Sequence, residues 1–342
     1  MLKKKHIASL AIVGLASTFA LTACSGDGDT DAASCVGTAT DSEASGATTT
    51  DYFAGPNAAT TNVSAASHIT PRAAAGDDLG TINLGFLPSW TDGLSMAYLA
   101  QDQLEKMGYT VEFEELNEAG PLFTALARGD VDVFPSAWPE VTHAAYMEQY
   151  GDDLEDLGAY YDGAVLTIAV PTYMEDVNSI EDLVGCADRY DGEIIGIEPG
   201  AGLTGVTQDS MMPEYGLDDD YELVTSSTAG MLAELDTAYA AEEDIVVTLW
   251  RPFWAYNDWD MKDLEDPKGA MGEPETLNFM GHAGFSEEFP EAAELFSQIK
   301  LNDEQYGALE GLVTSDEYAD APEDAVDTWI EENGDQFDWI LK

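Results

Sequence analysis

The feature that most constrains the fold of this 342-residue chain is a strand–helix–strand–helix–strand pattern that occurs twice. The first copy begins at Thr81 and ends near Phe134, and the second begins at Glu193 and ends near Leu249. In each copy, short apolar runs alternate with longer segments of helical periodicity. This order predicts an α/β fold with a mixed, mostly parallel sheet and helices on both of its faces.

The expected elements follow from these apolar patterns. The predicted strands are Thr81–Leu87, Thr110–Glu114 and Val131–Phe134 in the first copy, and Glu193–Ile197, Tyr221–Thr225 and Ile245–Leu249 in the second. The predicted helices are Gly93–Met107 and one that includes Leu122–Ala127, then one from about Leu203 and one at Ala229–Tyr239.

The two copies also align residue by residue at their strand ends. Gly85–Trp90 aligns with Gly196–Ala201 at an offset of 111, and the segments that end at Trp138 and Trp250 align at an offset of 112. Chance similarity between strand–turn segments is the alternative. Because both pairs fall at the same points of the pattern, we favour an internal duplication that produces two similar lobes.

Two segments are candidates for connections between the lobes. Ala164–Pro171 is an apolar run that can cross from one lobe to the other, and Thr276–Phe279 can cross back. The helices from Pro290 onward would then complete the first lobe. The expected domains are residues 79–171 with 275–342, and residues 172–274. Two crossovers between two lobes form a hinge, with a ligand cleft between the lobes.

The N-terminus has the features of a targeting segment. Lys3, Lys4 and Lys5 precede the apolar stretch Ile7–Leu21, which is short for a membrane span. The stretch ends in Leu-Thr-Ala-Cys24, which resembles the bacterial lipobox; an ordinary secretory signal with an incidental cysteine is the alternative. We expect residues 1–23 to be a signal peptide and Cys24 to be lipidated. The protein would then be exported and anchored to the outer face of the cytoplasmic membrane.

Residues 24–78 are mainly Ser, Thr, Ala, Gly and Asp, which predicts a flexible tether. The whole chain has 67 acidic and 12 basic residues and a net charge of −55. A basic partner or metal capture is one interpretation of this charge. A solvated acidic surface, typical of proteins that remain soluble in high salt, is the better one. Nucleic acid is excluded as a partner, because little basic surface is present to neutralise phosphates.

The cysteines and histidines give no metal-binding pattern. Three cysteines and four histidines are scattered along the chain, so we expect no metal or other cofactor. Apart from Cys24, the cysteines are Cys35 and Cys186; an exported location permits a disulfide, but the sequence does not show that they meet. The chain also lacks a nucleophile elbow, an HExxH motif, a P-loop and a Rossmann glycine pattern, so an enzyme is not expected.

Three tryptophans follow apolar runs and stand beside proline-containing turns. Trp90 follows Leu-Pro-Ser, Trp138 precedes Pro139, and Trp250 precedes Arg-Pro. These positions are strand ends, where open α/β sheets bind ligands. Three indoles that meet in one cleft can enclose a quaternary ammonium group, a cation that has no N–H and is attracted by aromatic faces.

The fourth equivalent strand end is Ala201, and it differs in character. The segment Glu198–Leu203 has no bulky side chain in its middle and precedes a predicted helix, whose N-terminal amides suit an anion such as a carboxylate. A simple strand-to-helix turn is the alternative. His143, five residues after Trp138, is either a packing residue or a donor to that carboxylate. Glycine betaine and proline betaine have both required ends.

The sequence resembles the substrate-binding component of glycine betaine/proline betaine ABC importers over nearly all of residues 79–342. The resemblance lies in four segments, which are Pro135–His143, Gly196–Gly202, Leu223–Ser227 and Val247–Trp254. It implies a periplasmic-binding-protein fold and a monomeric receptor that delivers an osmoprotectant to an ABC permease with its ATPase. It also implies a cage of Trp90, Trp138 and Trp250, and a carboxylate site at His143 and the amides of Gly202 and Leu203.

Some questions stay open from the sequence. Arg251 stands where the family often has a small polar residue; it either reaches the ligand carboxylate or forms a salt bridge with an acid. Ala201 is a further candidate contact. Trp254, Trp259, Trp329 and Trp339 are assigned to packing. The alternative functions are a binding protein for choline or carnitine, and a sensory or structural surface lipoprotein.

Overall fold

The computed structural model describes residues 79–342; the predicted signal peptide, Cys24, Cys35 and the predicted tether lie outside the described residues. Among the residues described, the strands are β1 (Thr81–Phe86), β2 (Thr110–Glu115), β3 (Val133–Ala137), β4 (Leu154–Pro171), β5 (Glu193–Gly196), β6 (Glu222–Thr225), β7 (Val247–Arg251), β8 (Met261–Asp263) and β9 (Glu275–His282). None of the helices in this part of the chain is both long enough and apolar enough to span a membrane.

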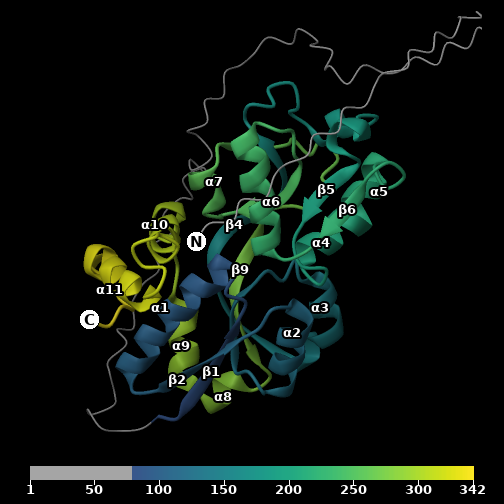
Figure 1. Ribbon diagram of the computed structural model, residues 1–342. Helices are drawn as coiled ribbons and strands as arrows, with labels where there is room; N and C mark the ends of the chain where they lie inside the picture. Colours follow the sequence, from purple (N-terminus) through teal and green to yellow (C-terminus); the bar gives the residue numbers. More distant parts are fainter. Residues whose placement is uncertain (1–78) are drawn as a thin grey trace, which may run out of the picture. The chain divides into compact units, whose positions relative to one another are not determined.

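Helices connect and cover the strands (Figure 1). The α-helices are α1 (Thr91–Met107), α2 (Ala119–Arg128), α3 (Ala144–Tyr150), α4 (Gly202–Val206), α5 (Met212–Tyr215), α6 (Thr228–Ala241), α7 (Ala255–Asp258), α8 (Phe285–Glu288), α9 (Pro290–Gln298), α10 (Asp303–Val313) and α11 (Pro322–Asn333). Short 3₁₀ turns are η1 (Gly151–Asp153), η2 (Ile180–Leu183), η3 (Ala187–Tyr190) and η5 (Gly334–Gln336), and η4 (Thr207–Met211) is a π-helical segment that joins α4 to α5.

The two repeats have the same strand topology. The sheet order is β2-β1-β3-β9-β4-β7-β5-β6, and β8 pairs with β4. In the first lobe β1 lies between β2 and β3 and is parallel to both; in the second lobe β5 lies between β6 and β7, also parallel to both. Leu84 of β1 pairs with Val133, and Ile195 of β5 pairs with Val247. The predicted two-lobe α/β fold is therefore confirmed.

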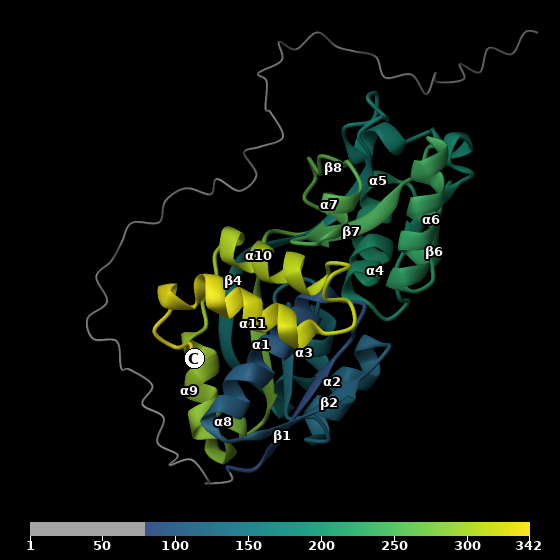
Figure 2. The same ribbon diagram turned by 60° about the vertical axis from the view of Figure 1, so that its left-hand side comes forward.

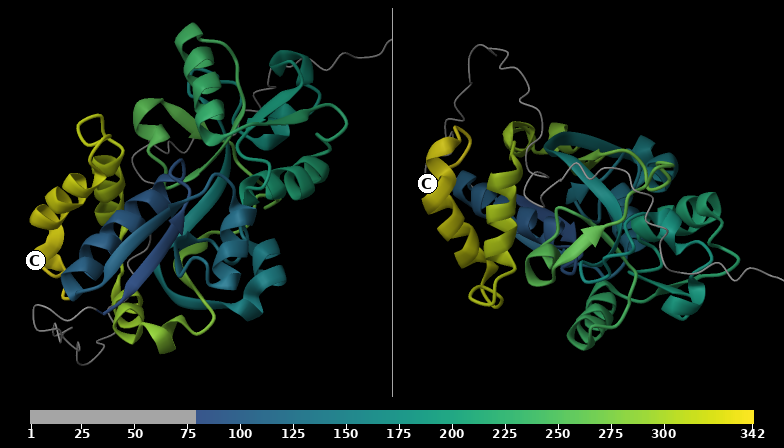
Figure 3. Two further views of the ribbon diagram at one scale, coloured as in Figure 1. Left: turned by 60° about the horizontal axis from the view of Figure 1, so that its bottom comes forward. Right: turned by 90° about the horizontal axis from the view of Figure 1, so that it is seen from above.

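The long strand β4 is the first crossover between the lobes. Its N-terminal part pairs antiparallel with β9 as far as Ala164, and its C-terminal part pairs antiparallel with β7 from Val165 onward. The crossing point thus lies inside the predicted apolar run, although the strand already begins at Leu154. In Figure 3 (left), the blue strands of the first repeat and the green strands of the second lie in different parts of the body.

The return crossover lies earlier than the sequence predicted. Thr276–Phe279 belongs to β9, which pairs only with β3 and β4 of the first lobe. A strand that is paired on both sides within one lobe cannot also connect the lobes. The chain returns instead through the segment between β8 and β9. The proposed domain boundaries at residues 171 and 275 stay a prediction.

The C-terminal helices complete the first lobe, where α10 and α11 pack against α1 (Figure 2). Trp329 of α11 is fully buried, and its indole N–H donates to the carbonyl of Gln305 at 2.9 Å. Thr91, the first residue of α1, bonds to the buried Glu310 of α10. The segment that carries Trp90 is therefore anchored to a C-terminal helix of its own lobe.

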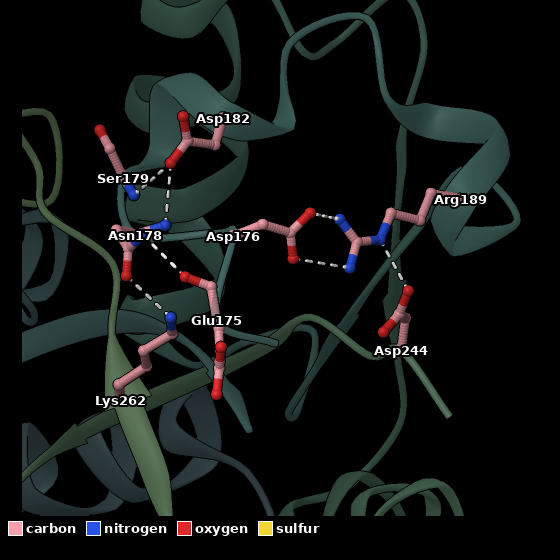
Figure 4. A network of polar contacts seen from close by, with 8 residues as sticks. All are labelled: Glu175, Asp176, Asn178, Ser179, Asp182, Arg189, Asp244 and Lys262. Carbon is pink, nitrogen blue, oxygen red and sulfur yellow. Dashed lines mark hydrogen bonds and ion pairs between the residues drawn. The ribbon is translucent and has the colours of Figure 1, made fainter. Parts of the chain in front are cut away.

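Two of the few basic side chains of the second lobe, Arg189 and Lys262, lie near acids. Arg189 bridges two segments through a bidentate contact to Asp176 and a contact of 2.6 Å from its Nε to Asp244, as Figure 4 shows. Lys262 of β8 donates to the side chain of Asn178 at 2.8 Å. In a chain with so few cations, a bidentate arginine links segments that would otherwise repel one another.

Candidate ligand-binding site

A pocket between the lobes has a volume of about 340 Å³, which includes space open to solvent. Its lining comes from both repeats and consists of Trp90, Asp92, Trp138, Thr142, His143, Leu166, Ile197, Ala201, Gly202, Leu203 and Trp250. The structure therefore brings together all the predicted ligand-binding residues and Ala201, but not Arg251. They meet because the carboxyl ends of β1, β3, β5 and β7 face the same cleft.

The three tryptophans of the pocket have different supports. The indole N–H of Trp90 donates to Glu198 of the second lobe at 3.3 Å, and that of Trp138 donates to Asp92 of its own lobe at 3.0 Å. Trp250 stacks on Phe253, with ring centroids 4.0 Å apart. These contacts hold large aromatic faces in the pocket wall, as cation–π recognition requires.

Asp92 is a pocket residue that the sequence did not reveal. The residue is 3% exposed, and its carboxylate also accepts a hydrogen bond from Ser136 at 2.5 Å. Burial raises the pKa of Asp92, and the hydrogen bonds from Ser136 and Trp138 act in the opposite direction. Its position in the first turn of α1 was a weak signal, because acids are so common here that no single one stands out.

His143 has one ring nitrogen engaged within its own loop. It is the N-cap of α3, because the chain after Pro139 forms turns up to His143 and becomes helical only at Ala144. Its Nδ1 accepts the backbone N–H of Trp138 at 2.9 Å, and burial lowers the pKa of the imidazole to about 3. A neutral ring whose Nδ1 accepts must carry its hydrogen on Nε2. The ring is therefore a donor at neutral pH.

Gly202 and Leu203 are the first two residues of α4, so the carbonyls of the helix cannot accept their N–H groups. The helical path continues through η4 and α5 to Tyr215, and its dipole places partial positive charge at these amides. A Cβ on Gly202 would lie 1.7 Å from the carbonyl oxygen of Thr142 in the first lobe. Glycine is needed here because the two lobes approach so closely.

Glu275 organises the loop that carries Thr142 and His143. Its buried carboxylate accepts the backbone N–H of Val141 at 2.9 Å and that of Thr142 at 3.1 Å, and it also accepts from the Thr142 hydroxyl. Burial raises the pKa of Glu275. This residue begins β9, directly after the return crossover, so it connects the hinge to the pocket wall. No pattern in the sequence marks this residue.

Arg251 points to a different set of contacts. Its Nε lies 2.6 Å from Asp263 of β8, and its guanidinium stacks over the ring of Tyr256 at 3.5 Å. Of the two alternatives that the sequence left open, the structure shows the pair with an acid. Within residues 79–342 no group of three or more His, Cys, Asp or Glu side chains is placed to hold a metal ion.

The pocket thus combines an aromatic end with a group of neutral N–H donors, between two lobes joined by two crossovers. That combination defines a two-lobed substrate-binding protein. The model of the OpuAC family, described as the substrate binding domain of ABC-type glycine betaine transport systems, matches residues 80–332. The chain belongs to this family, which is a family of transport proteins and not of enzymes. The resemblance seen in the sequence is confirmed.

Individual relatives and solved structures agree with this family assignment. Lactococcal OpuAC in its closed conformation with glycine betaine is 30% identical, has a TM-score of 0.69, and matches 77% of this chain and 100% of its own. The glycine betaine/L-proline-binding protein of Borrelia burgdorferi is 29% identical, with a TM-score of 0.70 and coverage of 77% and 97%. The glycine betaine/carnitine transport binding protein of Listeria monocytogenes is 35% identical over 144 residues, which span 42% of this chain and 47% of that protein.

Proposed function

We propose that this protein binds glycine betaine or proline betaine in the pocket between its lobes and delivers it to an ABC importer for osmoprotection. The quaternary ammonium lies against Trp90, Trp138 and Trp250, where desolvated aromatic faces attract a cation. The carboxylate of Asp92, beside Trp138, adds negative charge at this end. The observation that carries the proposal is that these indoles line the same pocket as the donors for an anion.

The other end of the ligand meets three N–H groups. The amides of Gly202 and Leu203 and the Nε2–H of His143 supply a site for the betaine carboxylate, and all three residues line the pocket. Hydrogen bonds to a charged acceptor are worth about 1.5–3 kcal/mol each. Choline has no carboxylate and would leave these donors unused, so it should bind more weakly. This argument favours betaines over the choline alternative.

The wider setting of the protein follows the sequence features. We propose that the chain is exported, that Cys24 is lipidated and holds it at the outer face of the cytoplasmic membrane, and that it acts as a monomer with a permease and its ATPase. Catalysis has no part in this proposal. The lobes close on the ligand about the crossovers at β4 and between β8 and β9. The acidic surface suits a receptor that works in high external salt.

The test is calorimetric titration with glycine betaine, proline betaine, carnitine and choline, at low and at molar salt. Glycine betaine or proline betaine should bind most tightly, and the affinity should change little with salt because the contacts are buried. Tryptophan fluorescence should change on binding, which a purely structural surface lipoprotein would not show. Tighter binding of choline than of either betaine would contradict the assignment of the donor end.

A further inference from the structure

Glu198 forms a polar connection across the cleft. It follows β5 in the turn before α4, and the residue is 4% exposed. From its own lobe it accepts the N–H and the hydroxyl of Thr228, both at 2.9 Å. From the first lobe it accepts the indole N–H of Trp90 at 3.3 Å and the hydroxyl of Ser89 at 3.5 Å. One buried carboxylate therefore receives donors from both lobes.

The second lobe fixes this carboxylate independently of the first. Thr228 is the first residue of α6, so its N–H is one of the unpaired donors at a helix N-terminus, where negative charge is favoured. The bonds within the second lobe are also shorter than those across the cleft. When the lobes separate, Glu198 keeps its Thr228 contacts while Trp90 loses its partner.

The other indole contact to a carboxylate behaves differently. Trp138 donates to Asp92, and both residues belong to the first lobe. Its orientation therefore does not depend on lobe closure, whereas that of Trp90 does. A further first-lobe donor, the hydroxyl of Tyr146, reaches the carbonyl of Gly200 at 2.7 Å, two residues after Glu198. The same turn thus meets the first lobe at several points.

We propose that Glu198 is a positioning residue that orients the Trp90 indole only when the lobes are closed. The first lobe then supplies the Trp90 side chain of the aromatic cage, and the second lobe fixes its orientation. The proposal rests on the proposed function, because it concerns the same pocket. The carboxylate also polarises the indole through a charge-assisted hydrogen bond, which favours a cation at the ring face. Trp90 in turn stacks beside His143, with ring centroids 6.1 Å apart.

The chemistry of the four donors gives a sharp test. The Thr228 N–H meets Oε1 and the Trp90 N–H meets Oε2, and neither group can accept a hydrogen bond. In Glu198→Gln a single oxygen serves only one of them, and the amide NH₂ faces the other. As long as the oxygen keeps the bond from Thr228, the new NH₂ group faces the Trp90 N–H. Both groups are donors, so the hydrogen bond to Trp90 is lost. Trp90→Phe removes that N–H and should make the same substitution almost harmless to ligand binding.

The experiment is a double-mutant cycle on glycine betaine affinity, measured by calorimetry with the parent, Glu198→Gln, Trp90→Phe and the double variant. We expect Glu198→Gln to weaken binding about tenfold in the parent, which is about 1.4 kcal/mol, and less than about twofold in the Trp90→Phe background. Glu193→Gln, at the exposed start of β5, is the control for loss of one negative charge. It should leave the affinity unchanged.

Each outcome of the cycle either supports or overturns the positioning role of Glu198. Equal losses in both backgrounds would mean that Glu198 acts through its charge or through Thr228, and would overturn the positioning role while betaine binding by the parent still stands. No loss in the parent background would overturn it as well. A parent that does not bind glycine betaine would overturn the proposed function, and this proposal with it. If circular dichroism shows that Glu198→Gln does not fold, Glu198→Asp takes its place in the same cycle, because the shorter side chain withdraws the carboxylate from Trp90.

Discussion

Replacing Gly202 by alanine should prevent the lobes from closing on a ligand without damaging either lobe. A Cβ at this position would lie 1.7 Å from the carbonyl oxygen of Thr142, whereas real contacts of this kind are not shorter than 3.0 Å. The two groups must then separate by at least 1.3 Å, which is 3.0 minus 1.7. The backbone of Gly202 is not in the left-handed region, so alanine is locally acceptable. Because the obstacle is a contact between lobes, opening relieves it.

This separation is large compared with the contacts that it breaks. The hydrogen bond from Tyr146 to Gly200, now 2.7 Å, would exceed hydrogen-bond range if it lengthened by the same amount. The amides of Gly202 and Leu203 would also withdraw from a carboxylate held by the first lobe. Two charge-assisted hydrogen bonds at about 1.5 kcal/mol each amount to about 3 kcal/mol. We therefore expect glycine betaine affinity to fall by about 100-fold or more.

Gly205 offers a matched control on the same helix. A Cβ there meets nothing within 4 Å, so Gly205→Ala should bind like the parent and be slightly more stable, because alanine favours helices. Calorimetry would give the affinities, thermal unfolding the ligand-free stabilities, and small-angle scattering the change in radius of gyration on adding ligand. If Gly202→Ala binds within about threefold of Gly205→Ala, the close approach at Thr142 is not a feature of the bound state.

Three further predictions concern single residues. Trp138→Ala should weaken betaine binding at least about 30-fold, and Trp138→Phe less, because a desolvated cation–π contact is worth about 2 kcal/mol or more; Trp329→Ala should lower the melting temperature and leave titrations nearly unchanged. Since burial lowers the pKa of His143 to about 3, affinity should stay constant between about pH 5 and about pH 8, whereas a fall near pH 6.5 would show a titrating imidazole. Burial raises the pKa of Glu310 from 4.5 to about 8, so the unfolded state loses this proton first and the free energy of unfolding should decrease as pH rises through that range. Glu310→Gln should remove this part of the pH dependence in denaturant unfolding, and an unchanged slope would contradict the assignment.

The sequence by itself determined the architecture and the aromatic side chains of the pocket. The order of strands and helices required parallel units, and the offset between Trp138 and Trp250 showed that the units were equivalent. Parallel strands of such units end at one edge, so residues that follow them must meet there. For that reason Trp90 and the segment Glu198–Leu203 were found from local patterns, although they lie far apart in the chain. The family resemblance then pointed to the amides of Gly202 and Leu203, and both residues line the pocket.

Only the tertiary structure decided how these residues are held. Asp92 and Glu198 each accept an indole N–H, and Glu275 orders the loop before His143, yet in a chain with 67 acids the sequence marks none of them. The partner of Arg251 was equally open until β8 placed Asp263 beside it. Periodicity reports on the burial of an element, whereas a hydrogen bond depends on atoms of different elements meeting within about 3 Å. That proximity is set by the packing of the two lobes, which no local pattern in the sequence records.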